Sequence, residues 1–377
     1  MDRFFHSVTL DKDLCVGCTN CIKRCPTQAI RVRAGKAQII SERCIDCGEC
    51  VRVCPHHAKK ARHDGLEMLD KFKYTVALPA PALYGQFNRL DEIDYVLHGL
   101  KSLGFDDVFE VSRAAEIVSD ATRQLLADGR LKKPVISSAC PAVVRLIRVR
   151  FPDLCENVLP LRSPMEVAAR LAREQAVKNT GLPPEAVGVF FISPCAAKVT
   201  DVKVPIGIER SNVDGVLAIS DIYPKLVGCM NKLEQVEPIA HSGIIGVGWS
   251  SIGGEAAGLL NENHLAADGI ENVIKVLEEL EDEKLQELDF IELNACSGGC
   301  VGGIFAAENG YVARARIHRL RKYLPVSCNR LDDAGGLGGL KWTQPLEYAP
   351  VMTLAENVED AMRMMGVRAT LDNLEIL

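Results

Sequence analysis

CVGCTNCIKRC, residues 15–25, followed by Pro26, is the stretch that decides the fold of the first part of the chain. A second copy, CIDCGECVRVC, covers residues 44–54 and precedes Pro55. Both follow the pattern C-x2-C-x2-C-x3-C-P, and thiolates with this spacing are typical ligands of iron–sulfur clusters. Three cysteines of each run can surround one face of a cubane, while the fourth reaches the other cluster. The repeat therefore predicts two [4Fe–4S] clusters.

The predicted ligands form two sets. We assign the first cluster to Cys15, Cys18, Cys21 and Cys54, and the second to Cys44, Cys47, Cys50 and Cys25. A pair of zinc ribbons is the alternative, but zinc calls for four ligands in one tetrahedral shell. We expect a small hairpin between the runs, turning at Ala34 and Gly35. The module resembles bacterial two-cluster ferredoxins over about residues 6–62.

Basic residues and histidines follow the second run: His56, His57, Lys59, Lys60, Arg62 and His63. The pattern favours a solvated helix face. The alternative is a docking patch for an acidic redox partner.

Composition excludes several classes of protein. The chain has 377 residues, 47% of them hydrophobic and 25% charged, which is typical of a soluble globular protein with two or three domains. A net charge of −6 argues against a nucleic-acid partner. The sequence has neither a signal-peptide pattern nor a run of eighteen apolar residues, so we expect a cytoplasmic protein without a membrane span. Its fifteen cysteines cluster, which favours metal over disulfides.

The polar stretch DGLEMLDKFKY marks a boundary, and we divide the chain into domains 1–64 and 65–377. Strands are expected at 75–78, 107–111, 135–138, 187–192, 215–218 and 290–293, and helices at 91–103, 114–128, 141–150, 164–179, 220–232, 270–281 and 358–365. Asp91 and Ser220 are the expected helix N-caps. This alternation predicts an α/β fold with parallel strand pairs. The glycine-rich stretch IIGVGWSSIGG lacks a complete phosphate-binding motif, and we attribute its glycines to tight packing.

Four more cysteines stand at the expected strand ends. Cys140 lies in SSACPAVV, Cys195 in FISPCAAK, and Cys296 and Cys300 in ELNACSGGCVGG. Ligands of α/β folds bind in the crevice at the carboxyl ends of the strands. Four thiolates that meet there are a suitable ligand set for a third [4Fe–4S] cluster.

These loops resemble, in the same order, the TSCCP, PCTAK and ACPGGCxGG loops of [FeFe]-hydrogenases. The resemblance covers about residues 74–328 and implies an N-terminal α+β ferredoxin-like module followed by a two-lobed α/β hydrogenase domain. It also implies an H-cluster, in which Cys140, Cys195, Cys296 and Cys300 hold a cubane. Cys300 would bridge that cubane to a diiron centre with carbonyl, cyanide and dithiolate ligands.

The resemblance assigns further residues to the cofactor. Lys198 matches the lysine that contacts a cyanide ligand, and Ala80 and Pro81 match a segment that lines the cluster. Ser193 and Asn294 stand where two methionines are usual.

The proton side departs from the family pattern. Ala139 replaces a cysteine that relays protons, and it also borders the cofactor. Asp120 lies near the position of a relay glutamate, with Arg123 interrupting the route. We therefore expect slow turnover, as in the sensory or divergent branch of the family.

Three functions remain open: a hydrogenase, a hydrogen or redox sensor with the same cofactor, and a non-catalytic protein with three [4Fe–4S] clusters that acts in redox sensing, electron transfer or cluster assembly. The partners that the resemblance implies are a ferredoxin or a partner subunit, together with hydrogenase maturation proteins. The chain ends at Leu377 without the further Fe–S or sensor domain that sensory members carry, so we expect either truncation or signalling through a partner.

Overall fold

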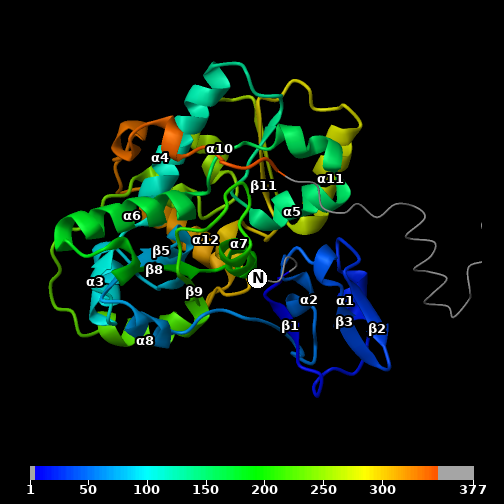
Figure 1. Ribbon diagram of the computed structural model, residues 1–377, viewed down its shortest axis with the longest axis horizontal. Helices are drawn as coiled ribbons and strands as arrows, with labels where there is room; N and C mark the ends of the chain where they lie inside the picture. The colour runs from blue at the N-terminus through cyan, green and yellow to red at the C-terminus, as the bar shows by residue number, and fades with distance from the viewer. Residues whose placement is uncertain (1–4, 347–377) are drawn as a thin grey trace, which may run out of the picture.

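The computed structural model describes residues 5–346 of the chain. Figure 1 shows a small N-terminal module, in blue, against a larger domain. A helix expected at 358–365 lies outside the described residues. No helix within 5–346 combines the length and the apolar character needed to cross a membrane.

The module consists of two antiparallel strand pairs and two one-turn helices. Strand β1 (Val8–Leu10) pairs with β4 (Lys59–Ala61), β2 (Ile30–Arg33) pairs with β3 (Lys36–Ile39), and the helices are α1 (Asn20–Lys23) and α2 (Glu49–Arg52). The β2–β3 hairpin turns at Ala34 and Gly35, both with positive φ, as the sequence predicts.

The basic segment after the second cysteine run is not a helix face. It contains strand β4, in which side chains alternate between core and solvent. Lys59 is only 3% exposed, whereas Lys60 lies in solvent. The prediction of a uniformly solvated face is therefore wrong at Lys59.

The larger domain contains two parallel sheets, which confirms the α/β fold. One sheet has the order β6 (Asp107–Val108), β5 (Tyr74–Pro79), β8 (Val187–Ser193), β9 (Gly215–Ala218), and the other has the order β10 (His264–Asp268), β11 (Phe290–Asn294), β7 (Val135–Ile136). Its helices are α3 (Asp94–Ser102), α4 (Val111–Ala127), α5 (Pro141–Arg150), α6 (Pro164–Thr180), α7 (Ala196–Lys203), α8 (Ile219–Met230), α9 (Ile244–Gly248), α10 (Gly254–Gly258), α11 (Ile270–Glu281) and α12 (Gly310–Arg321).

Several boundaries differ from the sequence prediction. Helix α3 is preceded by Ile93 rather than capped by Asp91, and α8 begins at Ile219 with Ala218 before it, so Ser220 lies inside the helix. Asp94, in the first turn of α3, instead accepts a hydrogen bond from the N–H of Ala240 at 2.8 Å. These ends are set by tertiary contacts that local propensity does not report.

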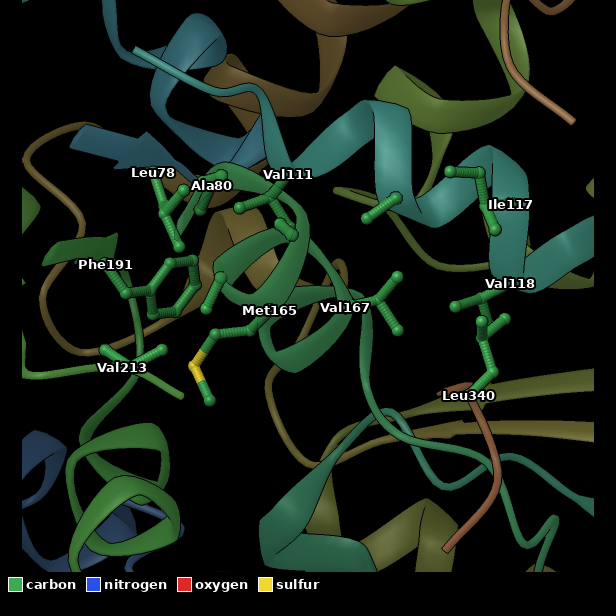
Figure 2. Packing of buried hydrophobic residues seen from close by; sticks show 14 of the residues in the cluster. Leu78, Ala80, Val111, Ile117, Val118, Met165, Val167, Phe191, Val213 and Leu340 are labelled. Carbon is green, nitrogen blue, oxygen red and sulfur yellow. The ribbon is translucent and has the colours of Figure 1, made fainter. Parts of the chain in front are cut away.

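Both faces of the four-stranded sheet are buried, as is usual for parallel sheets. Val76 and Leu78 of β5 face one hydrophobic cluster, while Ala77 between them faces another. Figure 2 shows part of the first cluster, where Leu78, Phe191 and Met165 lie close together. This packing fixes the strand ends at which the predicted cysteines stand.

The module is fastened to the larger domain by a buried carboxylate. Asp46 accepts hydrogen bonds from the N–H groups of Ser7 and Val8 at 3.0 and 2.9 Å, and from the Thr200 hydroxyl at 2.6 Å. Thr200 lies on α7, which begins directly after Cys195. Ile45 beside it is 2% exposed and packs into a hydrophobic cluster of the larger domain. The second cysteine run is thus held against the loop that carries Cys195.

Candidate metal centre

Two small cavities in the module collect the eight N-terminal cysteines. Cys15, Cys18, Cys21 and Cys54 line the outer cavity, and Cys25, Cys44, Cys47 and Cys50 line the inner cavity; each encloses about 20 Å³. The structure therefore gathers the cysteines in the two predicted sets, with the fourth cysteine of each run crossing to the other cavity.

Backbone N–H groups point at several of these sulfurs. Ala29 donates to Cys25 Sγ at 3.2 Å, and Ala58 donates to Cys54 Sγ at 3.3 Å. Such bonds stabilise the negative charge of a thiolate and are a common feature of iron–sulfur sites. Gly17, with φ +71°, allows the first cysteine run to approach the β2–β3 turn, because a Cβ there would lie 2.5 Å from the Gly35 carbonyl oxygen.

A third cavity, the large cavity, lies at the carboxyl ends of strands from both sheets and encloses about 100 Å³. All four predicted cysteines line it: Cys140, Cys195, Cys296 and Cys300. Cys140 immediately precedes α5, and Cys195 immediately precedes α7. The positive end of each helix dipole therefore lies near a cysteine. The volume of this cavity is about five times that of the inner cavity.

The electrostatics of these thiols suit a cationic group. Burial and the neighbouring Cys296 and Cys140 raise the pKa of Cys195 to about 12. Burial likewise raises the pKa of Cys296 to about 11, and that of Cys300 rises well above its ordinary value. Four thiolates would repel one another in so dry a site, and iron ions would remove that penalty. The donor set therefore fits a metal cluster.

A cation of the module reaches this cavity. Arg52 of α2 donates a hydrogen bond through Nη2 to Cys296 Sγ at 3.3 Å, and its Nε lies 3.2 Å from Glu49 Oε1. Arg52 stands between Cys50 and Cys54 in sequence. Arg52 consequently links Cys296 of the large cavity to Glu49, which lines the inner cavity.

Lys198 lines the large cavity, as predicted, and it is 9% exposed. Its Nζ lies 3.1 Å from Asp201 Oδ2, and Arg145 Nη2 lies 3.9 Å from the other oxygen of the same carboxylate. The ammonium therefore has a protein partner that the sequence did not indicate.

The five residues expected beside the cofactor all line the large cavity: Ala80, Pro81, Ala139, Ser193 and Asn294. The Ser193 hydroxyl accepts a hydrogen bond from the N–H of Cys195 at 3.0 Å, which fixes the turn that carries this cysteine. Much of the wall is apolar and includes Phe191, Met165 and Trp249.

Asp120 is not brought to this site. It is absent from the described residues that line the large cavity. Its carboxylate lies 2.9 Å from Arg123 Nη2 and accepts the N–H of Leu331 at 3.0 Å. Burial opposes ionisation, but these two partners outweigh it and hold the pKa of Asp120 below its ordinary value. The geometry thus gives no support to a relay role for Asp120.

The acidic groups that do line the large cavity are Glu255 and Glu292, which sequence reasoning missed. Glu292 accepts N–H bonds from Ala256 at 2.9 Å and Gly253 at 3.0 Å. Glu255 accepts the Ser137 hydroxyl at 2.6 Å, the one donor that residues 5–346 provide to it. Burial and the nearby Glu292 charge raise the pKa of Glu255 well above its ordinary value.

Asn294 connects this pair to the cysteines. Its Nδ2 donates to Glu292 at 2.9 Å, and its Oδ1 lies 4.0 Å from Cys300 Sγ. On the other side, the Ser137 hydroxyl that contacts Glu255 also accepts the N–H of Ala139 at 3.1 Å. The one usable sequence signal was Glu292, a charged residue inside the apolar strand FIELN.

The glycine-rich stretch next to Glu255 packs two short helices tightly. A Cβ on Gly254 would lie 1.8 Å from the carbonyl oxygen of Gly248. This confirms the packing interpretation of its glycines and places Glu255 at the start of α10.

Comparison with known proteins gives a consistent result. Residues 73–242 and 255–304 match the family described as the iron-only hydrogenase large subunit, C-terminal domain, and residues 7–55 match the 4Fe–4S dicluster domain. Iron hydrogenase 1 of Clostridium pasteurianum is 23% identical over 292 residues, which is 61% of this chain and 50% of that protein. The periplasmic [Fe] hydrogenase large subunit of Nitratidesulfovibrio vulgaris is 30% identical over 212 residues, 51% of this chain and 50% of that protein.

A third relative, the NADP-reducing hydrogenase subunit HndD of Solidesulfovibrio fructosivorans, is 29% identical over 143 residues, 35% of this chain and 24% of that protein. The chain therefore spans between a quarter and a half of the length of these relatives. HydA1, an [FeFe]-hydrogenase of Chlamydomonas reinhardtii, shares the fold, with a TM-score of 0.53 at 16% identity over 67% of this chain and 86% of that one. Since the hydrogenase match covers more than half of its residues, the chain belongs to the iron-only hydrogenase large-subunit family.

Proposed function

We propose that this chain holds an H-cluster and slowly interconverts two protons and two electrons with H2, as a low-turnover hydrogenase or a sensor of H2. The observation that carries the proposal is the convergence of Cys140, Cys195, Cys296 and Cys300 on one cavity. In this proposal the four thiolates would hold a cubane, and Cys300 would also help to hold a diiron unit.

The diiron unit, with carbonyl, cyanide and dithiolate ligands, would supply the hydrogen chemistry. The chain's own residues surround it. Lys198, held in place by Asp201, would present an ammonium to an anionic ligand of that unit. Ala80, Pro81 and Ser193 form part of the wall. The apolar wall excludes water, which strengthens each electrostatic contact inside.

Electrons would enter through the module. Leu14 and Val16, near the outer cavity, are 44% and 60% exposed, and Cys18 is exposed. An apolar surface beside a cluster suits docking of a ferredoxin or of a partner subunit. One relative is itself a subunit of an NADP-reducing hydrogenase. Dedicated maturation proteins would install the diiron unit.

Protons would pass through the glutamate pair. Ala139 carries no titratable group, but Glu255 and Glu292 line the same cavity, and Asn294 connects Glu292 with Cys300. A carboxylic acid beside a carboxylate can give and take a proton near neutral pH. The route therefore starts from different residues than those predicted from sequence, and the sequence expectation of slow turnover still rests on Ala139.

A non-catalytic protein with three [4Fe–4S] clusters is the second candidate. The observation that favours it is the ion pair between Lys198 and Asp201. Lys198 has a structural partner and does not require a cyanide ligand to explain its burial. The two candidates differ in whether any H2 is made.

The test is H2 formation by the anaerobically matured full chain with reduced methyl viologen. The proposal predicts slow H2 formation that a Cys300→Ser variant lacks. Cys229→Ser is the matched control, because Cys229 lines none of the three cavities described above, and it should leave the rate unchanged. Complete inactivity of protein with a full complement of iron, carbonyl and cyanide would contradict the catalytic proposal.

A further inference from the structure

Lys59 is a buried cation in a module of only about sixty residues. Its side chain lies in strand β4, is 3% exposed, and its Nζ finds no hydrogen-bond partner among the described residues. Burial of an ammonium without a partner is strongly unfavourable, and lysines are almost never fully buried unless a charge compensates them. The sequence neighbour Lys60 shows the ordinary arrangement: it is exposed and lies 3.1 Å from Asp11.

The position of Lys59 shows which group can compensate its positive charge. Lys59 lines the outer cavity together with its four cysteines. Asp11, which directly follows β1, is already paired with Lys60. The anion that faces Lys59 is therefore the content of the outer cavity.

A cubane with four thiolate ligands is such an anion, and one-electron reduction makes it one unit more negative. A fixed cation at the cavity wall stabilises the reduced form more than the oxidised form. Charge and hydrogen bonds around a cluster are known to set its potential in this way. The low dielectric of a buried site strengthens the effect.

We propose that Lys59 raises the redox potential of the outer cluster and so makes this cluster easier to reduce. This inference rests on the proposed binding of clusters in the module, but not on hydrogen chemistry. Each reduction adds one electron from an external donor to the outer cubane, with no bond made or broken.

The experiment is a reductive titration of the full chain, produced without maturation proteins and followed by electron paramagnetic resonance. Lys59→Met should lower the ratio of reduced to oxidised outer cluster at a fixed potential on the order of tenfold, or about 59 mV for a one-electron couple. Lys59→Arg keeps the charge and should remain near the wild-type value. Lys60→Met is the matched control and should show little change.

An outer cluster in Lys59→Met with the wild-type potential, or a higher one, would overturn the inference. Should Lys59→Met not retain the cluster, Lys59→Gln removes the same charge while keeping a polar group, and the same two outcomes apply. Iron analysis of the wild type distinguishes a failure of cluster binding from a failure of the role proposed for Lys59. Fewer than two cubanes in the module would refute cluster binding itself, whereas a full complement with an unshifted potential would refute only the role of Lys59.

Discussion

Glu255 and Glu292 share a dry pocket in which both cannot be ionised without a large penalty. Burial raises the pKa of Glu292, but N–H donors from Asn294 and two backbone groups offset part of this rise, so Glu292 ionises more readily than Glu255. Glu255 has only the Ser137 hydroxyl beside it in the described part of the chain, and burial and the Glu292 charge raise its pKa well above the ordinary value, so it holds its proton more strongly than Glu292. An acid and a base are thereby set side by side at the large cavity.

Glu255→Gln tests this assignment in the iron-free protein. A raised pKa means that the folded state binds more protons than the unfolded state. The stability from protonated Glu255 is therefore complete below its ordinary carboxyl pKa of 4.5 and is lost as the pH rises toward the folded-state pKa. The loss should be about 1.4 kcal/mol per pH unit in this window.

The expected result is a free energy of urea unfolding that falls as the pH rises above about 5 in the wild type, and falls less steeply in Glu255→Gln. The same variant in matured protein should lose about a hundredfold in H2 formation if Glu255 moves protons. Glu287→Gln, an exposed glutamate, serves as control for both measurements. Equal pH slopes in wild type and Glu255→Gln would contradict the protonated state assigned to Glu255.

Short elements, rather than the long helices, connect the metal sites. Helix α2 has four residues; Cys50 within it faces the inner cavity, and Arg52 at its end reaches Cys296. Helix α7 begins after Cys195 and is tied to the module through Thr200 and Asp46. The module and the large cavity are therefore in contact through the side chains of two short helices, α2 and α7.

Arg52→Gln should make the cubane of the large cavity harder to reduce. The guanidinium at 3.3 Å from Cys296 Sγ stabilises the added negative charge, and the amide of glutamine does not. The measurement is a redox titration of that cubane in protein produced without the diiron unit. Arg33→Gln, an exposed change in the same module, is the control. An unchanged cubane potential in Arg52→Gln would show that this contact has no electronic effect.

For the whole molecule, the sequence predicted the two sets of four cysteines in the module, the α/β architecture and the meeting of three cysteine-bearing loops at one cavity. These succeed because ligand spacing and strand periodicity are local properties of the chain. Glu255 and Lys59 could not be predicted, because their roles depend on which segments pack against them. The prediction for Asp120 failed for the same reason: its carboxylate pairs with Arg123 and does not line the large cavity.

The central claim is that the large cavity holds an H-cluster on Cys140, Cys195, Cys296 and Cys300. Infrared spectroscopy of the anaerobically matured chain tests it most directly, because iron-bound carbonyl and cyanide absorb where proteins do not. We predict carbonyl and cyanide bands in the wild type and their loss in Cys300→Ser. A fully iron-loaded, matured wild type without these bands would contradict the claim.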